Sequence, residues 1–558
     1  MKNKELVSEK SFVFFVPKNK DLFGNDFSTD KSDIVSGHPN LGVAYLTSFL
    51  KSYGMNVHIY DDALEDDIGV FEEIVNSTKP TMIGITGFSY SYKYLVDAIN
   101  SSYEITKKLG IPIVVGGPHV SATGSEILLN TNATFAVKGE GENTLLELIQ
   151  LYSNERNDYS SVDGLLWKDK FFGVKENQDR EWIRDLDALP YPDFDAFKLE
   201  RYSYTLLGKM PVISSRGCPY KCTFCSVKLS MGRNFRRRSP ENFVGEMNYW
   251  YERGYDKFEF NDDCFSTNMK HSLNICNEMI NRFQKRGKDI SYEIYNGIRV
   301  DRVTPELINK MKESGCTLIS YGVESGCQEI LDYIKKGITL EQVRQAVKWS
   351  NEAGIDNSLN FIIGHQGETM KTALETLKFA NSVDTSFVNF YNLIPYPGTD
   401  TYDWVMEHGK MLVPPESYLF NISYRDNLPI FETDDFTKSE RIIVTKKGFR
   451  LYEKKILRYR LGSVLGRIAY IIMGIRPLAR LGVSFFLYNK LGIYMYDFMK
   501  SFEMSSRVIE VPQPDSHNDS STSLGTQDHT RIKAITKDFP SPKVAENQVI
   551  SAHKVEIS

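Results

Sequence analysis

The sequence predicts an α/β protein built from two successive arrays of strands and helices. Short apolar runs alternate with helical patterns over residues 11–150, and a second alternation recurs about six times over residues 211–395. Strand–helix alternation is typical of parallel sheets wrapped by helices. The first array predicts a Rossmann-like sheet, and the second predicts a barrel or partial barrel. In both folds ligands bind at the carboxyl ends of the strands, so the chemistry is expected there.

The first array supplies glycine and polar turns at those strand ends. Strands are expected at residues 12–16, 56–60, 82–86 and 111–115, and helices at residues 41–53, 94–109 and 143–152. The glycines allow close backbone approach to a bulky ligand. The candidate binding residues are Asp61, Thr86, Ser89, Gly116, Gly117, His119, Gly139 and Gly141. These residues leave open a purely structural or nucleotide-binding Rossmann-like domain.

The second array carries polar groups at several of its strand ends. Its strands are expected at residues 212–215, 257–261, 292–298, 318–323, 358–363 and 387–394, with helices between them, for example at residues 241–251 and 304–314. Taken singly, each polar turn could be a solvated loop. Their recurrence at one end of one sheet favours a site, with candidates Asp262, Asp263, Glu324, Ser325 and Gly364.

Three cysteines, Cys218, Cys222 and Cys225, fall within eight residues directly after the first strand of this array. Gly217 and Pro219 favour a turn over a helix with three buried thiols. A structural zinc site usually needs four protein ligands, and no obvious fourth lies nearby in the sequence. An iron–sulfur cube held by three cysteines keeps one iron open, and this interpretation fits the spacing best.

The motif, with Phe224 before the last cysteine, resembles the signature of the radical S-adenosylmethionine (SAM) enzymes. The resemblance implies a six-unit partial barrel, a [4Fe–4S] cluster on the three cysteines, and SAM bound at the open iron. Reductive cleavage of SAM would yield an adenosyl radical, with a flavodoxin- or ferredoxin-type protein as electron donor. It also implies SAM contacts from Phe224, Asp262, Glu324, Ser325 and the Gly364 loop, in which Gln366 replaces the usual proline.

The first array resembles the cobalamin-binding domain that precedes the barrel in one large subfamily. The resemblance rests on the stretch 38–42, the Gly116-Gly117-Pro118-His119 turn and residues 139–142. It implies that cobalamin binds at the eight candidate residues of the first array. The Asp-x-His-x-x-Gly motif is missing, and Asp61-Asp62-Ala63-Leu64 stands where it is expected. We therefore expect no histidine below the cobalt, and His58 is expected to be packed in its strand.

Five segments follow from these patterns. We expect a cobalamin-binding domain at residues 1–155, a linker with a small hairpin at 156–205, and a radical SAM barrel at 206–425. A basic, mostly helical region is expected at 426–500 and a disordered tail at 501–558. Over residues 441–500 the basic residues indicate either a solvated helical cap or peripheral contact with an anionic membrane or lipid-like substrate.

Composition and cysteine content bear on nucleic-acid binding, on disulfide bonds and on the cellular location. The net charge of −5 excludes no partner, but no nucleic-acid-binding motif accompanies the basic residues, so nucleic acid is not expected. Seven cysteines, three of them clustered, do not form a secreted disulfide framework. An apolar signal region and an apolar run of about 20 residues are both missing, which predicts a cytoplasmic location.

The combined patterns predict a cobalamin-dependent radical SAM enzyme that methylates an unactivated carbon of a small-molecule or lipid-like substrate. A cyclase or rearrangement enzyme with the same cofactors is the first alternative. A cobalamin- or redox-sensing regulator is the second, although no DNA-binding or signalling module is visible in the sequence. The identity of the substrate cannot be derived from these residues.

Overall fold

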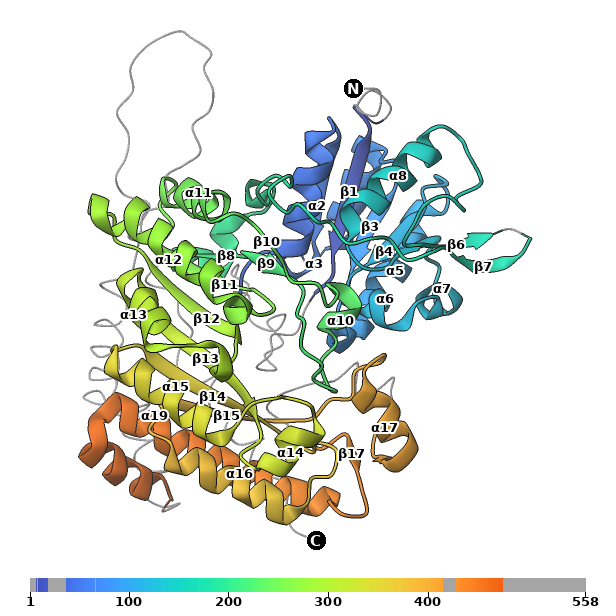
Figure 1. The fold of residues 1–558 in the computed structure, drawn as a ribbon. Coiled ribbons are helices and arrows are strands. Elements are labelled where there is room, and N and C mark those ends of the chain that lie inside the picture. Colours follow the sequence, from blue (N-terminus) through green and yellow to red (C-terminus); the bar gives the residue numbers. More distant parts are fainter. Residues whose placement is uncertain are drawn as a thin grey trace, which may run out of the picture. The chain divides into compact units, whose positions relative to one another are not determined.

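The computed structural model describes residues 7, 9–18, 37–65, 67–169, 171–414 and 428–474. The chain divides into one compact unit, residues 1–460, and a second, residues 461–558. Both sheets lie in the first unit, which is the subject of all that follows (Figure 1). The expected tail at residues 501–558 lies outside the described residues, as does the part of the basic region from residue 475 onwards.

The first sheet has seven strands in the order β2-β1-β3-β4-β5-β6-β7, and its first five strands are parallel. Apolar side chains alternate along β1, so that Phe12 and Phe14 face one helical layer and Val13 and Phe15 face the other. The strands are β1 (Ser11–Val16), β2 (Asn56–Asp61), β3 (Ile83–Thr86), β4 (Ile113–Gly116), β5 (Phe135–Val137), β6 (Leu165–Asp169) and β7 (Gly173–Glu176).

Helices cover both faces of this sheet, which confirms the Rossmann-like prediction. Two helices pack on one face, α2 (Leu41–Ser52) and α8 (Gly141–Ser153). Buried residues of α4, α5, α6 and α7 pack on the other. These helices are α4 (Ile68–Thr78), α5 (Tyr92–Thr106), α6 (Pro118–Thr123) and α7 (Glu126–Asn130), with a short α3 (Asp62–Glu65) after β2. His58 of β2 is exposed and not packed, because it alternates with the buried Val57.

The second sheet has six parallel strands in the order β15-β14-β13-β12-β11-β8, as expected for a six-unit partial barrel. The strands are β8 (Lys209–Val212), β11 (Lys257–Phe260), β12 (Ser291–Ile298), β13 (Cys316–Glu324), β14 (Asp356–Ile363) and β15 (Phe387–Asn392). The helices between them are α11 (Pro240–Tyr251), α12 (Met269–Arg282), α13 (Pro305–Glu313), α14 (Gln328–Tyr333), α15 (Leu340–Glu352) and α16 (Met370–Ser382).

The first barrel strand lies three residues earlier than expected. β8 ends at Val212, because Ser214 and Ser215 leave the sheet to donate hydrogen bonds to Asp262. The chain then forms a two-stranded antiparallel ribbon, β9 (Ser215–Arg216) with β10 (Arg236–Arg237). The cysteine loop and the short helix α10 (Val227–Ser230) therefore lie between the two strands of this ribbon.

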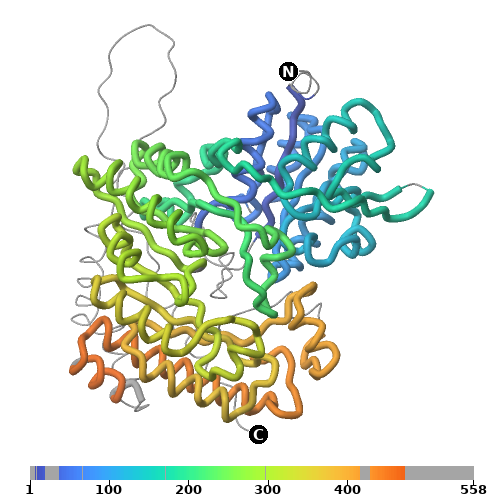
Figure 2. Tube along the Cα trace, in the orientation of Figure 1, coloured from blue at the N-terminus to red at the C-terminus, as the bar shows by residue number. Residues whose placement is uncertain are grey.

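The segment predicted as a linker is packed into the fold. Its expected hairpin forms β6 and β7, which extend the first sheet by antiparallel pairing of β6 with β5. The remainder, up to α9 (Ser203–Leu206), buries Leu186, Phe194 and Tyr202 in a core cluster that also contains residues of both sheets. Figure 2 traces this segment from the first sheet to the barrel. Polar composition concealed these apolar anchors, which are spaced too widely to show a period.

The helix α19 (Lys438–Gly474) begins the basic region, after α17 (Asp400–His408) and the strand pair β16 (Lys410–Met411) and β17 (Phe431–Glu432). In its first part the buried residues recur at helical spacing, as expected for a helix packed on one side. Gly448 contacts Phe390 of β15, and the Lys455 amine donates a 2.5 Å hydrogen bond to the Val383 carbonyl. In residues 438–460 part of the basic composition thus serves packing on the barrel.

Within the described residues no helix is long and apolar enough to cross a membrane.

Candidate active site

The cysteine loop is held at both ends by hydrogen bonds to the backbone. The Cys218 amide donates to the Gly232 carbonyl at 3.1 Å, and the Thr223 amide donates to the Ile334 carbonyl at 3.1 Å. Gly217, just before the first cysteine, adopts φ 87°, and a Cβ there would lie 2.4 Å from the Asn234 carbonyl oxygen. Glycine is therefore required at this turn.

Two neighbouring aspartates fix the start of the loop. The Asp262 carboxylate accepts hydrogen bonds from the amide and hydroxyl of Ser214 and from the Ser215 hydroxyl. Asp263 accepts from the Gly217 amide at 2.8 Å, and burial raises the pKa of its carboxyl to about 6. The predicted SAM ligand Asp262 is thus fully buried and already has partners within the protein, so its geometry favours orienting the loop.

The three cysteines are partly buried, and their environments differ. A hydrogen bond with Cys264 lowers the pKa of the Cys218 thiol, whereas burial raises the pKa of Cys222, and that of Cys225 to about 12. Cys264 is buried beside the first cysteine. Bound iron deprotonates such thiols outright, so these values describe the free chain.

The donor set fits a cluster. Three thiols lie on one loop, and among the described residues no three cysteine, histidine or acidic side chains lie close enough together to hold a single metal ion. A four-iron cube spreads its cysteine ligands more widely than one ion does. Three cysteine ligands would leave one iron for a further ligand, which stays a prediction from the sequence.

Side chains predicted to contact SAM gather beside this loop. The Phe224 ring lies 5.4 Å from the His365 ring and 6.0 Å from the Lys336 amine. Lys336 forms a buried 2.7 Å ion pair with Glu324, whose φ of 75° is in the left-handed region. Backbone strain at a non-glycine residue is typical of functional sites.

Ser325 and Gly364 form hydrogen bonds with other residues of the protein. The Ser325 hydroxyl is within 3.1 Å of the Thr376 hydroxyl and accepts from the Cys327 amide at 3.2 Å. The Gly364 amide donates to the buried Glu368 carboxylate, and burial raises the pKa of that carboxyl to about 7. Both residues therefore shape the two strand-end loops that lie near Phe224.

Sequence reasoning missed three side chains of this region: Lys336, Arg299 and His365. Arg299 lies over the Tyr220 ring at 3.7 Å and donates a 2.6 Å hydrogen bond to the Lys336 carbonyl. His365 is buried, and neither ring nitrogen has a hydrogen-bond partner in the described part of the chain. Burial lowers its pKa to about 3. Lys336 and Arg299 belong to no spaced motif, and His365 is the variable position of the Gly364 loop, so the sequence did not single them out.

A cavity of about 560 Å³ opens at the carboxyl ends of the first sheet. Its wall includes most of the predicted cobalamin residues, namely Asp61, Thr86, Gly116, Gly117, Gly139 and Gly141. It continues to residues beside the cysteine loop: Ile213, Arg216, Ser230, Met231, Asn261 and Asp263. Its size lies within the range of cofactor pockets, and it adjoins both predicted sites.

The residues of this cavity fit cobalamin. The Asn261 amide nitrogen in its wall is buried without a hydrogen-bond partner among the described residues, so a polar ligand could pair with it. Asp61 is hydrogen-bonded to the Tyr202 hydroxyl, and burial raises its pKa to about 6. The predicted residues Ser89 and His119 are not in the wall: the Ser89 hydroxyl lies 3.1 Å from His119 Nδ1.

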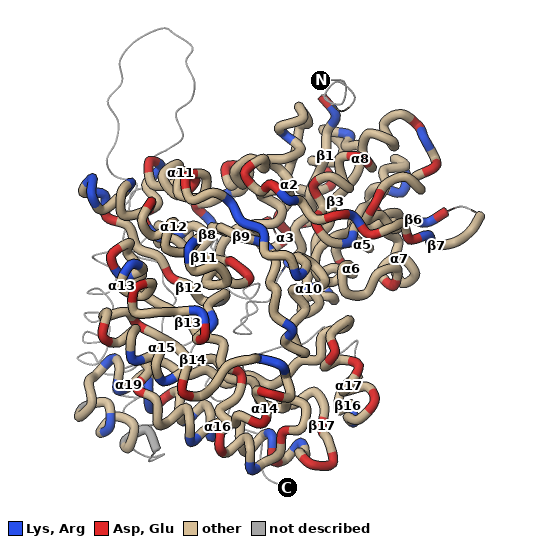
Figure 3. The backbone as a smooth tube through the Cα atoms, viewed as in Figure 1, with Lys and Arg blue, Asp and Glu red and all other residues tan. Residues whose placement is uncertain are grey.

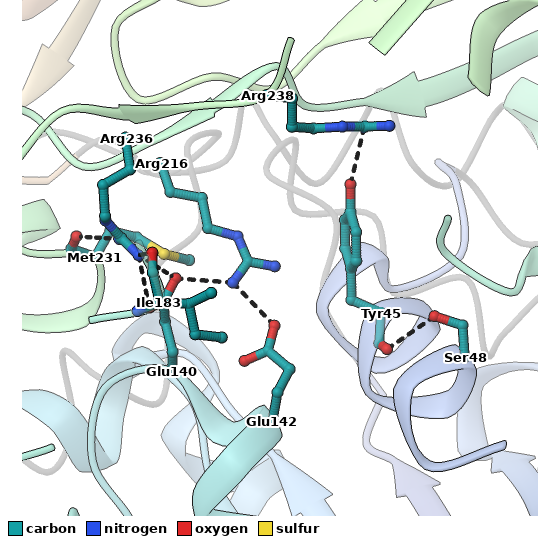
Figure 4. A network of polar contacts seen from close by, with 9 residues as sticks. All are labelled: Tyr45, Ser48, Glu140, Glu142, Ile183, Arg216, Met231, Arg236 and Arg238. Carbon is teal, nitrogen blue, oxygen red and sulfur yellow. Dashed lines mark hydrogen bonds and ion pairs between the residues drawn. The ribbon is translucent and has the colours of Figure 1, made fainter. Parts of the chain in front are cut away.

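Buried ion pairs connect the two sites (Figure 4). Glu140 and Glu142, between the cavity glycines and at the start of α8, pair with Arg216 and Arg236 of the β9–β10 ribbon. Figure 3 shows the run of basic residues along this ribbon. Neither acid nor arginine had been predicted as functional, because the pairs join segments that are distant in sequence.

Comparison with known proteins identifies the class of protein. Residues 212–380 match the radical SAM superfamily, and residues 32–149 match the B12 binding domain. An uncharacterized methyltransferase of Pyrococcus horikoshii is 32% identical over 379 residues, which cover 67% of this chain and 80% of that protein. The chain therefore belongs to the radical SAM superfamily and joins its barrel to a B12 binding domain. It is an enzyme whose cofactors are a [4Fe–4S] cluster, SAM and cobalamin.

Other relatives are more distant. The anaerobic magnesium-protoporphyrin IX monomethyl ester cyclase of Rubrivivax gelatinosus is 26% identical, and the match covers 78% of this chain and 77% of that protein. Two solved structures share the fold. The methyltransferase TsrM of Kitasatospora setae has a TM-score of 0.61 at 18% identity, covering 73% of this chain and 79% of that one. The cobalamin-dependent enzyme OxsB also has a TM-score of 0.61, at 19% identity, covering 89% and 76%.

Proposed function

We propose that this enzyme transfers a methyl group to a carbon atom of a polar small molecule. The observation that carries the proposal is the single cavity that runs from the glycine turns of the first sheet to residues beside the cysteine loop. When bound, the cluster and SAM supply one-electron cleavage, and cobalamin supplies a methyl carrier. The methyltransferase relatives support this chemistry, the Pyrococcus horikoshii protein foremost.

Each group of residues has a separate role in the proposal. Cys218, Cys222 and Cys225 hold the cluster. Phe224, Glu324, Ser325 and Gly364 line or shape the SAM site, with Lys336 as an added member, and Asp262 and Asp263 orient the cysteine loop. The glycines of the cavity wall allow the backbone to approach the corrin ring closely.

The polar side chains along one face of the second sheet favour a polar substrate over a lipid. On β8 and β12, Lys209 pairs with Glu293, which also accepts a 2.8 Å hydrogen bond from Tyr295. Across β13, β14 and β15, a second ladder joins Ser320, Asn360 and Asn389 at 2.9 Å per hydrogen bond. These side chains alternate with the apolar residues that face the helices.

One carboxylate on this face can accept a further hydrogen bond. Glu259 of β11 lies 3.8 Å from His38 through one oxygen, and its other oxygen is buried without a partner among the described residues. Asn261 of the cavity wall follows two positions later and so points to the same face. We propose that the substrate lies here, next to the cobalamin cavity, with a hydrogen-bond donor directed at Glu259.

Cyclisation or rearrangement without net methylation is the second candidate, because the Rubrivivax gelatinosus cyclase is similar over most of both chains. It uses the same residues in the same roles. The two candidates differ in the product: methylation adds one carbon to the substrate, and cyclisation adds none.

The partners and the location are further proposals. We propose a cytoplasmic enzyme that receives electrons from a flavodoxin- or ferredoxin-type protein and binds no nucleic acid. For residues 438–460 the packing of α19 on the barrel supports the solvated helical cap. Peripheral membrane contact through 441–500 depends on residues beyond 474, which lie outside the described ranges.

Anaerobic reconstitution tests the proposal. The full chain is loaded with iron, sulfide and hydroxocobalamin, and metal content and optical spectra are measured. We expect about four irons and one cobalt per chain. Replacing Cys222 by Ala removes one iron ligand, so the variant is expected to lose SAM cleavage while keeping the cobalt. Cleavage that persists in the loaded C222A variant would contradict the cluster assignment, and iron without cobalt in the wild type would contradict cobalamin-dependent methylation.

A further inference from the structure

The junction between the cobalamin loop and the cysteine loop contains four buried charges. Arg216 Nη1 lies 2.8 Å from Glu140 Oε1 and 2.9 Å from Glu142 Oε1, and Arg236 Nη1 lies 2.6 Å from Glu140 Oε2. All four side chains are at most 7% exposed. Two acids therefore balance two guanidinium groups, and Glu140 is the residue that contacts both arginines (Figure 4).

The segment that the sequence predicted to be a linker completes the network. The Ile183 amide donates to Glu140 Oε2 at 2.8 Å, and its carbonyl accepts from Arg236 at 2.8 Å. The neighbouring Trp182 ring lies 5.4 Å from the Arg236 guanidinium and is the closest group to a Cβ built at Gly139 or Gly232. Three segments far apart in sequence thus meet at one carboxylate.

Stability alone is a weak reason for such a network. Taking charges out of water costs several kcal/mol per ion. Well-packed apolar residues at the same positions often stabilise a protein equally well. The Arg216 guanidinium lies within ion-pair distance of two buried carboxylates, Glu140 and Glu142. What the pairs add is directional geometry, because guanidinium and carboxylate groups pair in few orientations.

The location of the network gives that geometry a use. Glu140 stands between Gly139 and Gly141, which both line the cavity, and Arg216 is two residues before Cys218. A displacement of the Glu140 carboxylate therefore moves the wall of one cofactor site relative to a ligand of the other.

We propose that Glu140 is a positioning residue that sets the distance and angle between bound cobalamin and the cluster through Arg216 and Arg236. This inference rests on the proposed placement of the two cofactors. Glu140 and Arg216 also line the cavity, but the proposed role concerns the relative placement of the two cofactors and not a contact with either one. Glu140 acts through the backbone of its own loop and through the arginines that precede and follow the cysteine loop.

The test is the magnetic coupling between the two cofactors in the full chain. Dithionite produces the reduced cluster and cob(II)alamin, both paramagnetic, and pulsed electron paramagnetic resonance reports their separation. The Glu140→Gln variant keeps the shape of the side chain and removes its charge. We expect it to load both cofactors, with a shifted and broader distance distribution and a single-turnover rate lower by about 10²-fold, as misplacements near 1 Å cause.

A matched control lies on α8, the helix that begins directly after Glu140. Glu147→Gln makes the same chemical change in α8 at the partly exposed ion pair with Arg180, and the distance distribution is expected to match that of the wild type. If the Glu140→Gln chain does not fold, Glu140→Asp retains the charge and withdraws it by one methylene, with the same expected shift.

An unchanged distribution in either folded, doubly loaded Glu140 variant would overturn the inference. Failure of the proposed function gives a different result, because the wild type itself would then lack one cofactor. The amide of the Glu140→Gln variant does not titrate. A change of pH that by itself restored the wild-type distance distribution in this variant would therefore also count against a charge-based role.

Discussion

Gly217 shows how one residue sets the shape of the cysteine loop. Its φ of 87° is in the left-handed region, and the space for a Cβ is taken by the Asn234 carbonyl oxygen at 2.4 Å and the Met231 carbonyl oxygen at 3.0 Å. Both obstacles are backbone atoms in the turn that returns the chain from the loop to β10. A side chain at this position would therefore displace the cysteines that follow.

The Gly217→Ala variant is expected to remain folded and to lose most of its cluster, because the methyl group forces the loop away from its return segment. Iron content after anaerobic reconstitution measures the effect. Gly287→Ala is the control: its φ is 67°, also left-handed, but nothing lies within 4 Å of the added Cβ. The control bears the same backbone penalty of about 1 kcal/mol without the clash. Equal iron content in both variants would show that the clash is harmless.

Among the helices, α15 begins beside the candidate SAM site and depends on its first residues. Thr339 accepts a hydrogen bond from the Gln342 amide at 3.2 Å, and the Gln342 side chain accepts one from the Thr339 amide at 2.8 Å. This reciprocal capping box satisfies two donors that the helix leaves unpaired. The cap residue Thr339 stands two positions after Gly337, so the start of the helix helps to hold the loop that contains Lys336.

We expect Thr339→Ala to lower the free energy of unfolding by about 1 kcal/mol, the usual cost of a lost N-cap. Thr339→Ser keeps the hydroxyl and should recover most of that loss. Urea unfolding of the apo chain measures both. A Thr339→Ser variant as unstable as Thr339→Ala would mean that the methyl group, and not the cap, matters here.

For the unit as a whole, buried histidines from separate elements make stability depend on pH. Burial lowers the pKa of His119 to about 4, of His271 to about 4 and of His365 to about 3. Because the folded-state pKa lies below the value of about 6.5 in the unfolded chain, the unfolded state binds more protons in this window. The contribution of these groups to stability is complete above pH 6.5 and is lost as the pH falls toward 4.

His271 offers a test outside the cofactor sites. Between pH 7 and pH 5 the wild type is expected to lose about 2 kcal/mol more unfolding free energy than His271→Gln, since one unit of pKa shift corresponds to about 1.4 kcal/mol. Urea unfolding of the apo chains at the two pH values gives the difference. His408→Gln, at an exposed position, should follow the wild type. Parallel losses in wild type and His271→Gln would contradict a buried neutral imidazole.

Much of the fold could be predicted because its signals are local. Strands such as β14 and β15 and helices such as α11 were expected within two residues of their observed ends, since apolar periodicity and turn residues lie within each element. Six of the eight predicted cobalamin residues line the cavity, because the turns that carry them are also local signals. The short strand β5 was missed, because three buried residues carry no measurable period.

Other features could not be predicted, since they depend on packing. The polar segment after β7 is anchored by Phe194 and Phe197, whose isolated positions in the sequence resemble ordinary loop residues. Lys336 and His365 reach Phe224 only when separate strand-end loops meet. His58 was expected to be packed, but the register of β2 leaves it exposed.

The cysteine motif and the strand–helix alternation carried the family resemblance that implied the class of enzyme and its cofactors, because both are short-range patterns that can be recognised without knowledge of contacts. The link between the cofactor sites had no such pattern. Glu140 and Arg216 are 76 residues apart, and each alone is an ordinary charged residue beside a glycine. Their role depends on the fold. Water would screen the two charges at the surface, whereas burial makes them a directional ion pair.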